Sequence, residues 1–325
     1  MPPFKVNLDL LQQFEHGLDP RYPEKSTVPT KVLGYGEIST VLEMGTGTDK
    51  EFAYKRMSMF KTKREVESYE ALHNEYVQVL EERVGIKIAQ SGIVHLIDET
   101  KGKTVVYIVQ EKLPVEGIMN KVLHQIPAKD VKKLVVAVLK EAAKVYNFND
   151  QHRGTLELAI DGQISNWAIL NSDPLNMDTS DPIELAYFDT STPFLRRDGV
   201  EQLDPELFLR SAPSFLTWIL KLFFLDDVMN RYYDFRKVAV DIIANFYKEQ
   251  LPELVPELVE TVNEFFTNQI SEGVMEPITV KEIEAYYRED AWIWRLYLTF
   301  RRVDRSLHRL LGKDYPYILP GRIKR

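Results

Sequence analysis

The pattern of hydrophobic and polar residues between positions 30 and 110 predicts a small antiparallel sheet. Short apolar-rich runs are separated by glycine-containing turns, which is typical of a meander of strands. The predicted strands are residues 30–33, 39–44, 52–56, 94–98 and 104–110. Between the third and fourth of these, residues 62–83 carry apolar side chains at helical spacing and contain no proline. We therefore expect five strands with one helix after the third.

The pattern becomes helical after Leu113-Pro114. Residues 129–147 predict an amphipathic helix, and Asp204-Pro205-Glu206 predicts a helix start, with Asp as the cap and Pro in the first turn. Two β-like runs, residues 164–170 and 184–188, flank a polar loop, and a short helix is predicted near residues 8–14. This order predicts an α+β fold with an N-terminal extension (1–29), a sheet part (30–113) and a mainly helical part (114–325).

Composition and charge are those of a globular protein and exclude several kinds of site. The 325 residues are 44% hydrophobic and 28% charged. With no cysteine, disulfides and thiolate metal sites are excluded, and the six scattered histidines argue against a zinc site. The net charge of -8 argues against nucleic acid as a partner. Basic residues cluster only near the C-terminus, from Arg301 to Arg325; we interpret them as a solvated helix face and tail, with a docking site for an acidic partner as the alternative.

The apolar segments are too short to span a bilayer. Residues 1–20 have no apolar run behind a basic start, and residues 215–225 are interrupted by Lys221. We therefore expect a cytoplasmic protein without a membrane partner. The oligomeric state stays open.

A glycine-containing turn and a lysine on the next strand suggest phosphate binding. Residues 34–41 read Gly34-Tyr35-Gly36-Glu37-Ile38-Ser39-Thr40-Val41. Glycines between two strands let backbone N–H groups approach phosphate oxygens. Lys55, in the following strand, could reach those phosphates, and an acidic residue in the next helix would hold it in place. Glu75, twenty residues after Lys55, is our candidate for that role, with Glu70 as the alternative.

Two further segments carry residues suited to phosphoryl transfer. Asp161 and Asn166 lie five residues apart ahead of the apolar run 167–170. This spacing fits a loop in which the Asp accepts a proton from a substrate hydroxyl and the Asn holds Mg²⁺. Asp189 follows the apolar run 185–188, where a carboxylate can chelate Mg²⁺. Each motif is weak alone, but their order along the chain is informative.

Together these residues resemble the protein-kinase-like superfamily, in particular its small-molecule branch, such as the aminoglycoside and choline phosphotransferases. The resemblance covers about residues 30–195. It implies a bilobal fold with a five-stranded N-lobe and a helical C-lobe, ATP and Mg²⁺ as cofactors, and transfer to a hydroxyl acceptor. It also implies that residues 106–113 form the fifth strand and the hinge, where the backbone of Glu111 and Leu113 meets adenine and Gln110 is the gatekeeper.

Departures from the family pattern leave an alternative open. Ala159 stands where the family has a histidine, and Asp189 is followed by Thr190-Ser191 rather than Phe-Gly. A nucleotide-binding pseudokinase or interaction module without transfer activity is therefore the alternative. The segment from Asp189 to the helix start at Asp204 is short for a peptide platform, and Ala212-Pro213-Ser214 lacks the Glu of the family's anchor. We expect a small-molecule acceptor rather than a protein, of unknown identity.

Overall fold

The computed structural model describes residues 4–36, 38–98, 103–171, 182–210, 229–269 and 275–321. Glu37, most of the polar loop after residue 171, Ala212-Pro213-Ser214, the apolar stretch 215–225 and the last basic residues (Arg322, Lys324 and Arg325) lie outside the described residues.

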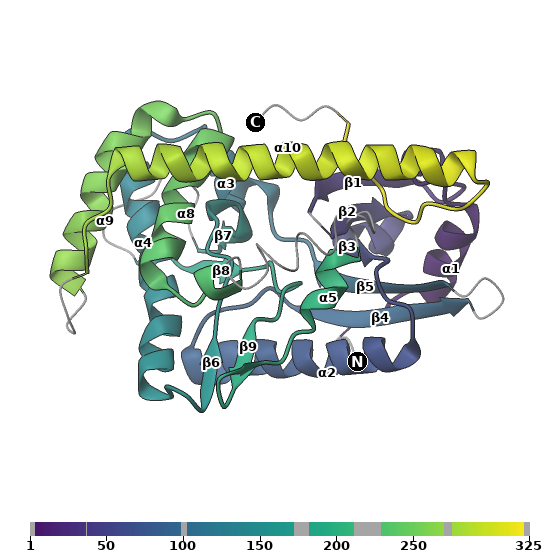
Figure 1. The fold of residues 1–325 in the computed structure, drawn as a ribbon, viewed down its shortest axis with the longest axis horizontal. Helices are drawn as coiled ribbons and strands as arrows, with labels where there is room; N and C mark the ends of the chain where they lie inside the picture. The colour runs from purple at the N-terminus through teal and green to yellow at the C-terminus, as the bar shows by residue number, and fades with distance from the viewer. Residues whose placement is uncertain are drawn as a thin grey trace.

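Five antiparallel strands form the main sheet (Figure 1). Their spatial order is β1-β2-β3-β5-β4. The bounds are β1 Thr30–Tyr35, β2 Ser39–Met44, β3 Phe52–Met57, β4 Ser91–Asp98 and β5 Lys103–Glu111. Each strand coincides with a predicted one to within a few residues, which confirms the antiparallel sheet.

Helices cover both faces of this sheet. Side chains alternate along each strand, so both faces carry apolar residues that pack against a helix. Tyr54 points to the face covered by α1 (Leu8–Gly17), where Leu11 and Phe14 are fully buried. Met57 points to the other face, covered by α2 (Lys63–Gln78). Thr62 caps α2 by accepting a hydrogen bond from the Glu65 N–H. One π-helical turn, Val79–Val84, continues α2 and ends at Gly85, whose φ of 80° favours glycine.

The rest of the chain is mainly helical and contains the largest hydrophobic core. Its helices are α3 Met119–Val122, α4 Ala128–Gln151, α5 Pro205–Leu209, α8 Phe235–Lys248, α9 Val255–Gln269 and α10 Val280–Leu310. Short 3₁₀ turns occupy Pro23–Lys25, Gly47–Glu51, Val115–Gly117, Ile164–Asn166 and Pro252–Leu254. Helix α4 lies at the centre of this core and contacts α8, α9 and β6. The fold is therefore α+β: a small antiparallel sheet with a helical part.

Two small sheets lie within the helical part. A hairpin pairs β7 (Trp167–Ile169) with β8 (Leu185–Tyr187). A three-stranded sheet has the order β10-β9-β6, from Val200–Glu201, Leu195–Arg197 and Leu156–Leu158. The segment predicted as β-like at 164–170 is thus a 3₁₀ turn followed by the short strand β7.

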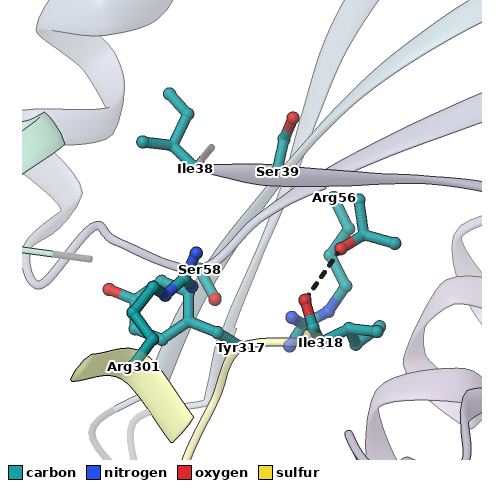
Figure 2. A pocket seen from close by; sticks show the side chains of 8 residues that line it. Ile38, Ser39, Arg56, Ser58, Arg301, Tyr317 and Ile318 are labelled. Carbon is teal, nitrogen blue, oxygen red and sulfur yellow. Dashed lines mark hydrogen bonds between the residues drawn. The ribbon is translucent and has the colours of Figure 1, made fainter. Parts of the chain in front are cut away.

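Helix α10 runs the length of the molecule, from α9 to the region of β1 (Figure 1). The chain then turns back, and residues 315–321 pack against the sheet. Thr40 Oγ1 donates a hydrogen bond to the Ile318 carbonyl (3.3 Å), and Arg56 Nη1 donates one to the Pro316 carbonyl (2.8 Å). Figure 2 shows this junction, where Ser39, Arg56, Ser58, Arg301 and Tyr317 line a cavity of about 10 Å³. Among the described residues, no helix is both long and apolar enough to cross a bilayer.

Candidate functional site

The β7–β8 hairpin brings two of the predicted site residues together. Trp167 pairs with Tyr187, and the Phe188 N–H donates to the Asn166 carbonyl at 3.0 Å. Asn166, just before β7, therefore lies across from the residue that precedes Asp189. Pairing of two short buried strands is sufficient to bring Asn166 and Asp189 together, although 23 positions separate these two residues in the sequence.

The Asp161 loop is tied to the same hairpin. Asn166 Nδ2 donates to the Asp161 carbonyl at 3.1 Å, and the Gln163 N–H donates to Asp161 Oδ1 at 3.2 Å. A Cβ added to Gly162 would lie 2.7 Å from a methyl group of Val238, so the close approach of α8 requires glycine there. Asp161, Asn166 and Asp189 thus lie on one tightly packed group of loops.

Lys55 reaches this group of loops from the sheet. Its ammonium forms an ion pair with Asp189 Oδ1 at 2.6 Å, and both side chains keep part of their surface exposed. Ser191 donates two hydrogen bonds to the same oxygen, from its N–H (3.2 Å) and from its hydroxyl (2.7 Å). The sheet and the hairpin therefore meet at one lysine–carboxylate pair.

The glycine turn lies on the same face of the sheet as Lys55. Gly34 pairs with Val41, and Val41 pairs with Lys55, so these three residues are in register across β1, β2 and β3. A Cβ added to Gly34 would meet no described atom within 4 Å, so a ligand could approach the backbone there. The Gly36 N–H donates to the Ser39 carbonyl at 3.0 Å, and the Ser39 side chain is buried, which closes the turn tightly.

The predicted hinge lies at the end of β5. Gln110 Nε2 donates to the Phe188 carbonyl at 3.2 Å, next to Asp189. The Glu111 N–H already donates to the Gln90 carbonyl at 3.1 Å, so Glu111 could offer adenine only its carbonyl. Leu113 follows β5 in the connection to the helical part.

The structure does not bring Glu75 to Lys55. Glu75 forms an ion pair with Arg197 at the surface, and Glu70 lies 4.0 Å from the His95 ring. Residues three or four positions apart share one face of a helix, and the face that points toward the site carries Tyr69, His73 and Tyr76. Neither glutamate lies on that face. Among the described residues, the ion-pair partner of Lys55 is Asp189.

Three neutral polar side chains of α2 occupy that face instead. The Tyr69 hydroxyl donates to the Ser191 carbonyl (2.8 Å), and the Tyr76 hydroxyl donates to the Ala159 carbonyl (2.8 Å). His73 Nε2 is hydrogen-bonded to Thr190 Oγ1 (2.9 Å). These residues hold the segments before Asp161 and after Asp189. The sequence pattern predicted a carboxylate in this role, whereas the polar groups on the predicted buried face of this helix were the usable signal.

Two carboxyl groups of the site have opposite pKa shifts. Burial raises the pKa of Asp161 to about 8, and the nearby carboxyls of Asp241 and Asp189 add to the effect. Burial also acts to raise the pKa of Asp189, but the Lys55 ammonium and the hydrogen bonds from Ser191 outweigh it and lower that pKa overall. Neighbouring carboxyls whose surroundings separate their pKa values are typical of acid–base sites.

The donor set fits Mg²⁺ bound together with phosphates. Within the described ranges, no three His, Cys, Asp or Glu residues are close enough to hold a metal. Asp189 and Asn166 offer two oxygen ligands from adjacent positions of one hairpin. Mg²⁺ usually takes one or two carboxylate ligands and completes its shell with substrate phosphates and water. A two-ligand protein site is therefore consistent with a metal that arrives with a nucleotide.

The buried His73 is expected to lower the unfolding free energy in mild acid. Burial lowers the pKa of His73 to about 4, and Lys55 contributes in the same direction. Because the unfolded histidine has a pKa of about 6.5, the unfolded state binds the proton first as the pH falls below that value. We expect this to remove roughly 2 kcal/mol of unfolding free energy between pH 7.5 and 4.5.

Urea unfolding of the wild type and His73→Gln at the two pH values checks this expectation. The stability of His73→Gln relative to the wild type should rise over the same interval, because this difference cancels contributions that both proteins share, such as that of Asp161. His152→Gln, at a partly buried surface position, is the control and should follow the wild type. Equal losses in His73→Gln and the wild type would contradict a buried neutral His73.

Comparison with known proteins gives a family but no activity. None of the curated proteins matches the sequence. Among solved structures, "WaaP in complex with acyl carrier protein" is similar at 15% identity with a TM-score of 0.33, over 76% of this chain and 96% of that chain. This structural similarity is too low to define the fold. The sequence model of a family of unknown function, DUF6206, matches residues 23–305, so the chain belongs to that family.

Proposed function

We propose that this protein is an ATP-dependent phosphotransferase with a bilobal, protein-kinase-like arrangement, and that its acceptor is a small molecule with a hydroxyl group. In this proposal residues 30–113 form the nucleotide-binding lobe and residues 114–325 the larger lobe. The observation that carries the proposal is the 2.6 Å pair between Lys55 of the sheet and Asp189 of the hairpin, beside Asn166 and Asp161. In phosphoryl-transfer sites a lysine contacts the phosphates and a carboxylate holds the metal ion beside them, so the two side chains lie close together.

Each residue has a defined role in this proposal. Lys55 and the backbone of residues 34–41, including Gly34, Gly36, Ser39 and Val41, would bind the phosphates, and Glu111 and Leu113 would contact adenine. Asp189 and Asn166 would hold Mg²⁺, which offsets the negative charge of the phosphates when it is bound. Most of the rate acceleration would come from positioning and charge stabilisation.

Asp161 would orient the acceptor hydroxyl and accept its proton. A carboxyl with a pKa of about 8 is mostly protonated at neutral pH, so it is a poor base in the free protein. Bound Mg²⁺ would place positive charge near this carboxyl, and positive charge beside a carboxyl lowers its pKa. We therefore expect Asp161 to act as a base only in the loaded site.

The expectation of a small acceptor is supported by the segment after Asp189. Residues 195–201 are used in β9 and β10, and α5 begins at Pro205. β9 pairs with β6, so this part of the chain is folded back on the molecule. Few residues between Asp189 and α5 are therefore left to bind an extended peptide.

One observation favours the alternative of a nucleotide-binding module without transfer activity. Among the described residues, Lys55 has no glutamate from α2, which in this proposal would position it for the phosphates. Nucleotide binding does not need this glutamate to keep the site folded. If a nucleotide releases Lys55 from Asp189, the hydrogen bonds of His73 and Tyr69 still hold the segment after Asp189 in place. Transfer of labelled phosphate to a small molecule separates the two functions.

Mg-ATP is expected to raise the melting temperature of the wild type. A ligand that binds only the folded state at about 100 times its Kd stabilises it by about 2.7 kcal/mol. Lys55→Met removes a phosphate contact and should reduce this shift strongly. Lys87→Met is the matched control, because Lys87 also pairs with a carboxylate, that of Glu184, but at the surface. No shift of the wild type at millimolar Mg-ATP would contradict a nucleotide site.

A further inference from the structure

Helix α10 exposes a row of large apolar side chains. Its inner face is buried through Ile283, Ala291, Trp294 and Leu298. The other face carries Trp292, which is 58% exposed, and Leu310, which is 79% exposed, with Leu296, Val303 and Leu307 between them. Isolated exposed apolar residues are normal, but a continuous row on one helix face marks an interaction surface.

The spacing of this row is that of a helix-packing surface. Trp292, Leu296, Thr299, Val303, Ser306 and Leu310, which we call the α10 stripe, are separated by alternating steps of four and three residues. This spacing places one side chain per half-heptad along a straight line, as in pairs of packed helices. Thr299 and Ser306 are small, and together with Arg302, Val303 and Leu307 they line a shallow recess of about 350 Å³ that is open to solvent. A large side chain from a second helix would fit there.

Arginines run along one side of the stripe. Arg288, Arg295, Arg302 and Arg309 repeat every seven residues. The first, second and fourth are exposed, and Arg302 is partly buried and donates to the Pro320 and Gly321 carbonyls. From residue 291 to 313 there are six basic residues and one acidic residue, whereas the whole chain has a net charge of -8. One of the six, Arg301, is buried on the inner face of the helix. The stripe is therefore an apolar surface bordered by basic residues on an acidic protein.

We propose that the α10 stripe binds an acidic amphipathic helix of a partner protein. Apolar side chains of that helix would cover the stripe, and its flanking carboxylates would face the arginine row. The side chain over Thr299 and Ser306 would occupy the recess. This inference is independent of the phosphotransferase proposal, since it uses no residue of that site.

The charges argue against a second copy of this chain as the occupant. In an antiparallel pair of α10 helices the two arginine rows would face each other. In a parallel pair each row would face Ile293, Phe300 and Leu307 of the other helix. Neither arrangement supplies a carboxylate to the arginines, whereas an acidic helix does.

A synthetic acidic helix tests the proposal with the full-length protein. The probe is a fluorescein-labelled peptide of four heptads with Leu at the contact positions and Glu at the flanking positions. Fluorescence anisotropy should give saturable binding with a Kd of about 10 µM at low salt, weakening as the salt concentration rises. A peptide of identical composition in permuted order should bind at least about tenfold more weakly, because its apolar residues no longer form one face.

Two variants locate the binding on the stripe. Val303→Glu should weaken binding at least about tenfold, since it puts charge into the centre of the apolar surface. Val200→Glu is the matched control, an exposed valine on β10 with 63% of its surface accessible, and should leave the affinity unchanged. The double variant Arg295→Glu/Arg309→Glu should lose the acidic peptide and gain a version with Lys in place of Glu. All of these substitutions are at exposed positions, and circular dichroism will verify that each variant remains folded.

Several outcomes would overturn the proposal. These are no binding of the acidic peptide at about 100 µM, equal binding of the permuted peptide, or no effect of Val303→Glu. Binding to phosphatidylserine vesicles without binding to the peptide would show a lipid surface instead. Self-association in sedimentation experiments that Val303→Glu abolishes would show that the stripe joins two copies of this chain.

Discussion

Replacing Asp161 with Asn is expected to stabilise the fold and to remove most of the proposed phosphoryl transfer. Burial raises the pKa of Asp161 to about 8, whereas an unfolded Asp has a pKa near 3.9. The folded state therefore holds this proton more tightly, and the stability that it contributes below pH 4 is lost as the pH rises toward 8. Asn keeps the shape of the side chain and has no proton to lose. We expect a gain of at least about 1 kcal/mol at pH 8.

Urea unfolding at pH 5 and pH 8 measures this effect. The stability difference between Asp161→Asn and the wild type should be larger at pH 8, because more of the cost of the buried carboxyl is present there. Asp150→Asn is the control, since Asp150 is exposed and pairs with Arg153 at the surface. A variant less stable than the wild type at pH 8 would contradict a partly buried Asp161 that holds its proton.

The same substitution separates catalysis from nucleotide binding. Turnover of labelled ATP with a panel of hydroxylated small molecules should fall by roughly 10²-fold or more, the usual effect of losing an acid–base group. ATP affinity should stay nearly unchanged, because Asp161 is proposed to contact the acceptor. Asp189→Ala should instead abolish Mg²⁺-dependent ATP binding. If both variants weakened ATP binding equally, the separate roles would be wrong.

Replacing Arg56 with Met is expected to cost about 3–5 kcal/mol of unfolding free energy, as found when one partner of a buried ion pair is removed. Arg56 is 3% exposed and donates to both carboxylate oxygens of Glu15, at 2.6 and 3.0 Å. The Tyr107 hydroxyl donates to the same carboxylate. Arg56 also donates a hydrogen bond to the Pro316 carbonyl, so the substitution loosens both α1 and the C-terminal segment.

Chemical denaturation with two further variants identifies the cause. Arg21→Met breaks an exposed pair with Asp19 and should change stability by no more than about 1 kcal/mol. Adding Glu15→Gln to Arg56→Met should restore part of the loss, because the buried carboxylate is then neutral. A loss below about 1 kcal/mol for Arg56→Met, or no recovery in the double variant, would contradict this account.

Local patterns in the sequence determined most of the elements of this fold. The strands of the main sheet, the helix after the third strand, and the start of α5 depend on apolar periodicity, turn glycines and caps. These signals act over a few neighbouring residues, so they are visible without coordinates. The order of Lys55, Asp161, Asn166 and Asp189 was also visible, and the structure brings Lys55 onto Asp189.

Tertiary structure alone decided which residues meet. Several glutamates of α2 were equivalent in the sequence, and only the packing of the helix turned Glu75 toward Arg197 and His73 toward Thr190. Likewise, residues 260 positions apart meet where Arg56 binds Pro316. The basic C-terminal residues were visible in the sequence, but burial of one face of α10 decided that their arginine row borders an exposed apolar stripe. Periodicity reports the neighbours of a residue within its own element, whereas such contacts depend on how distant elements pack.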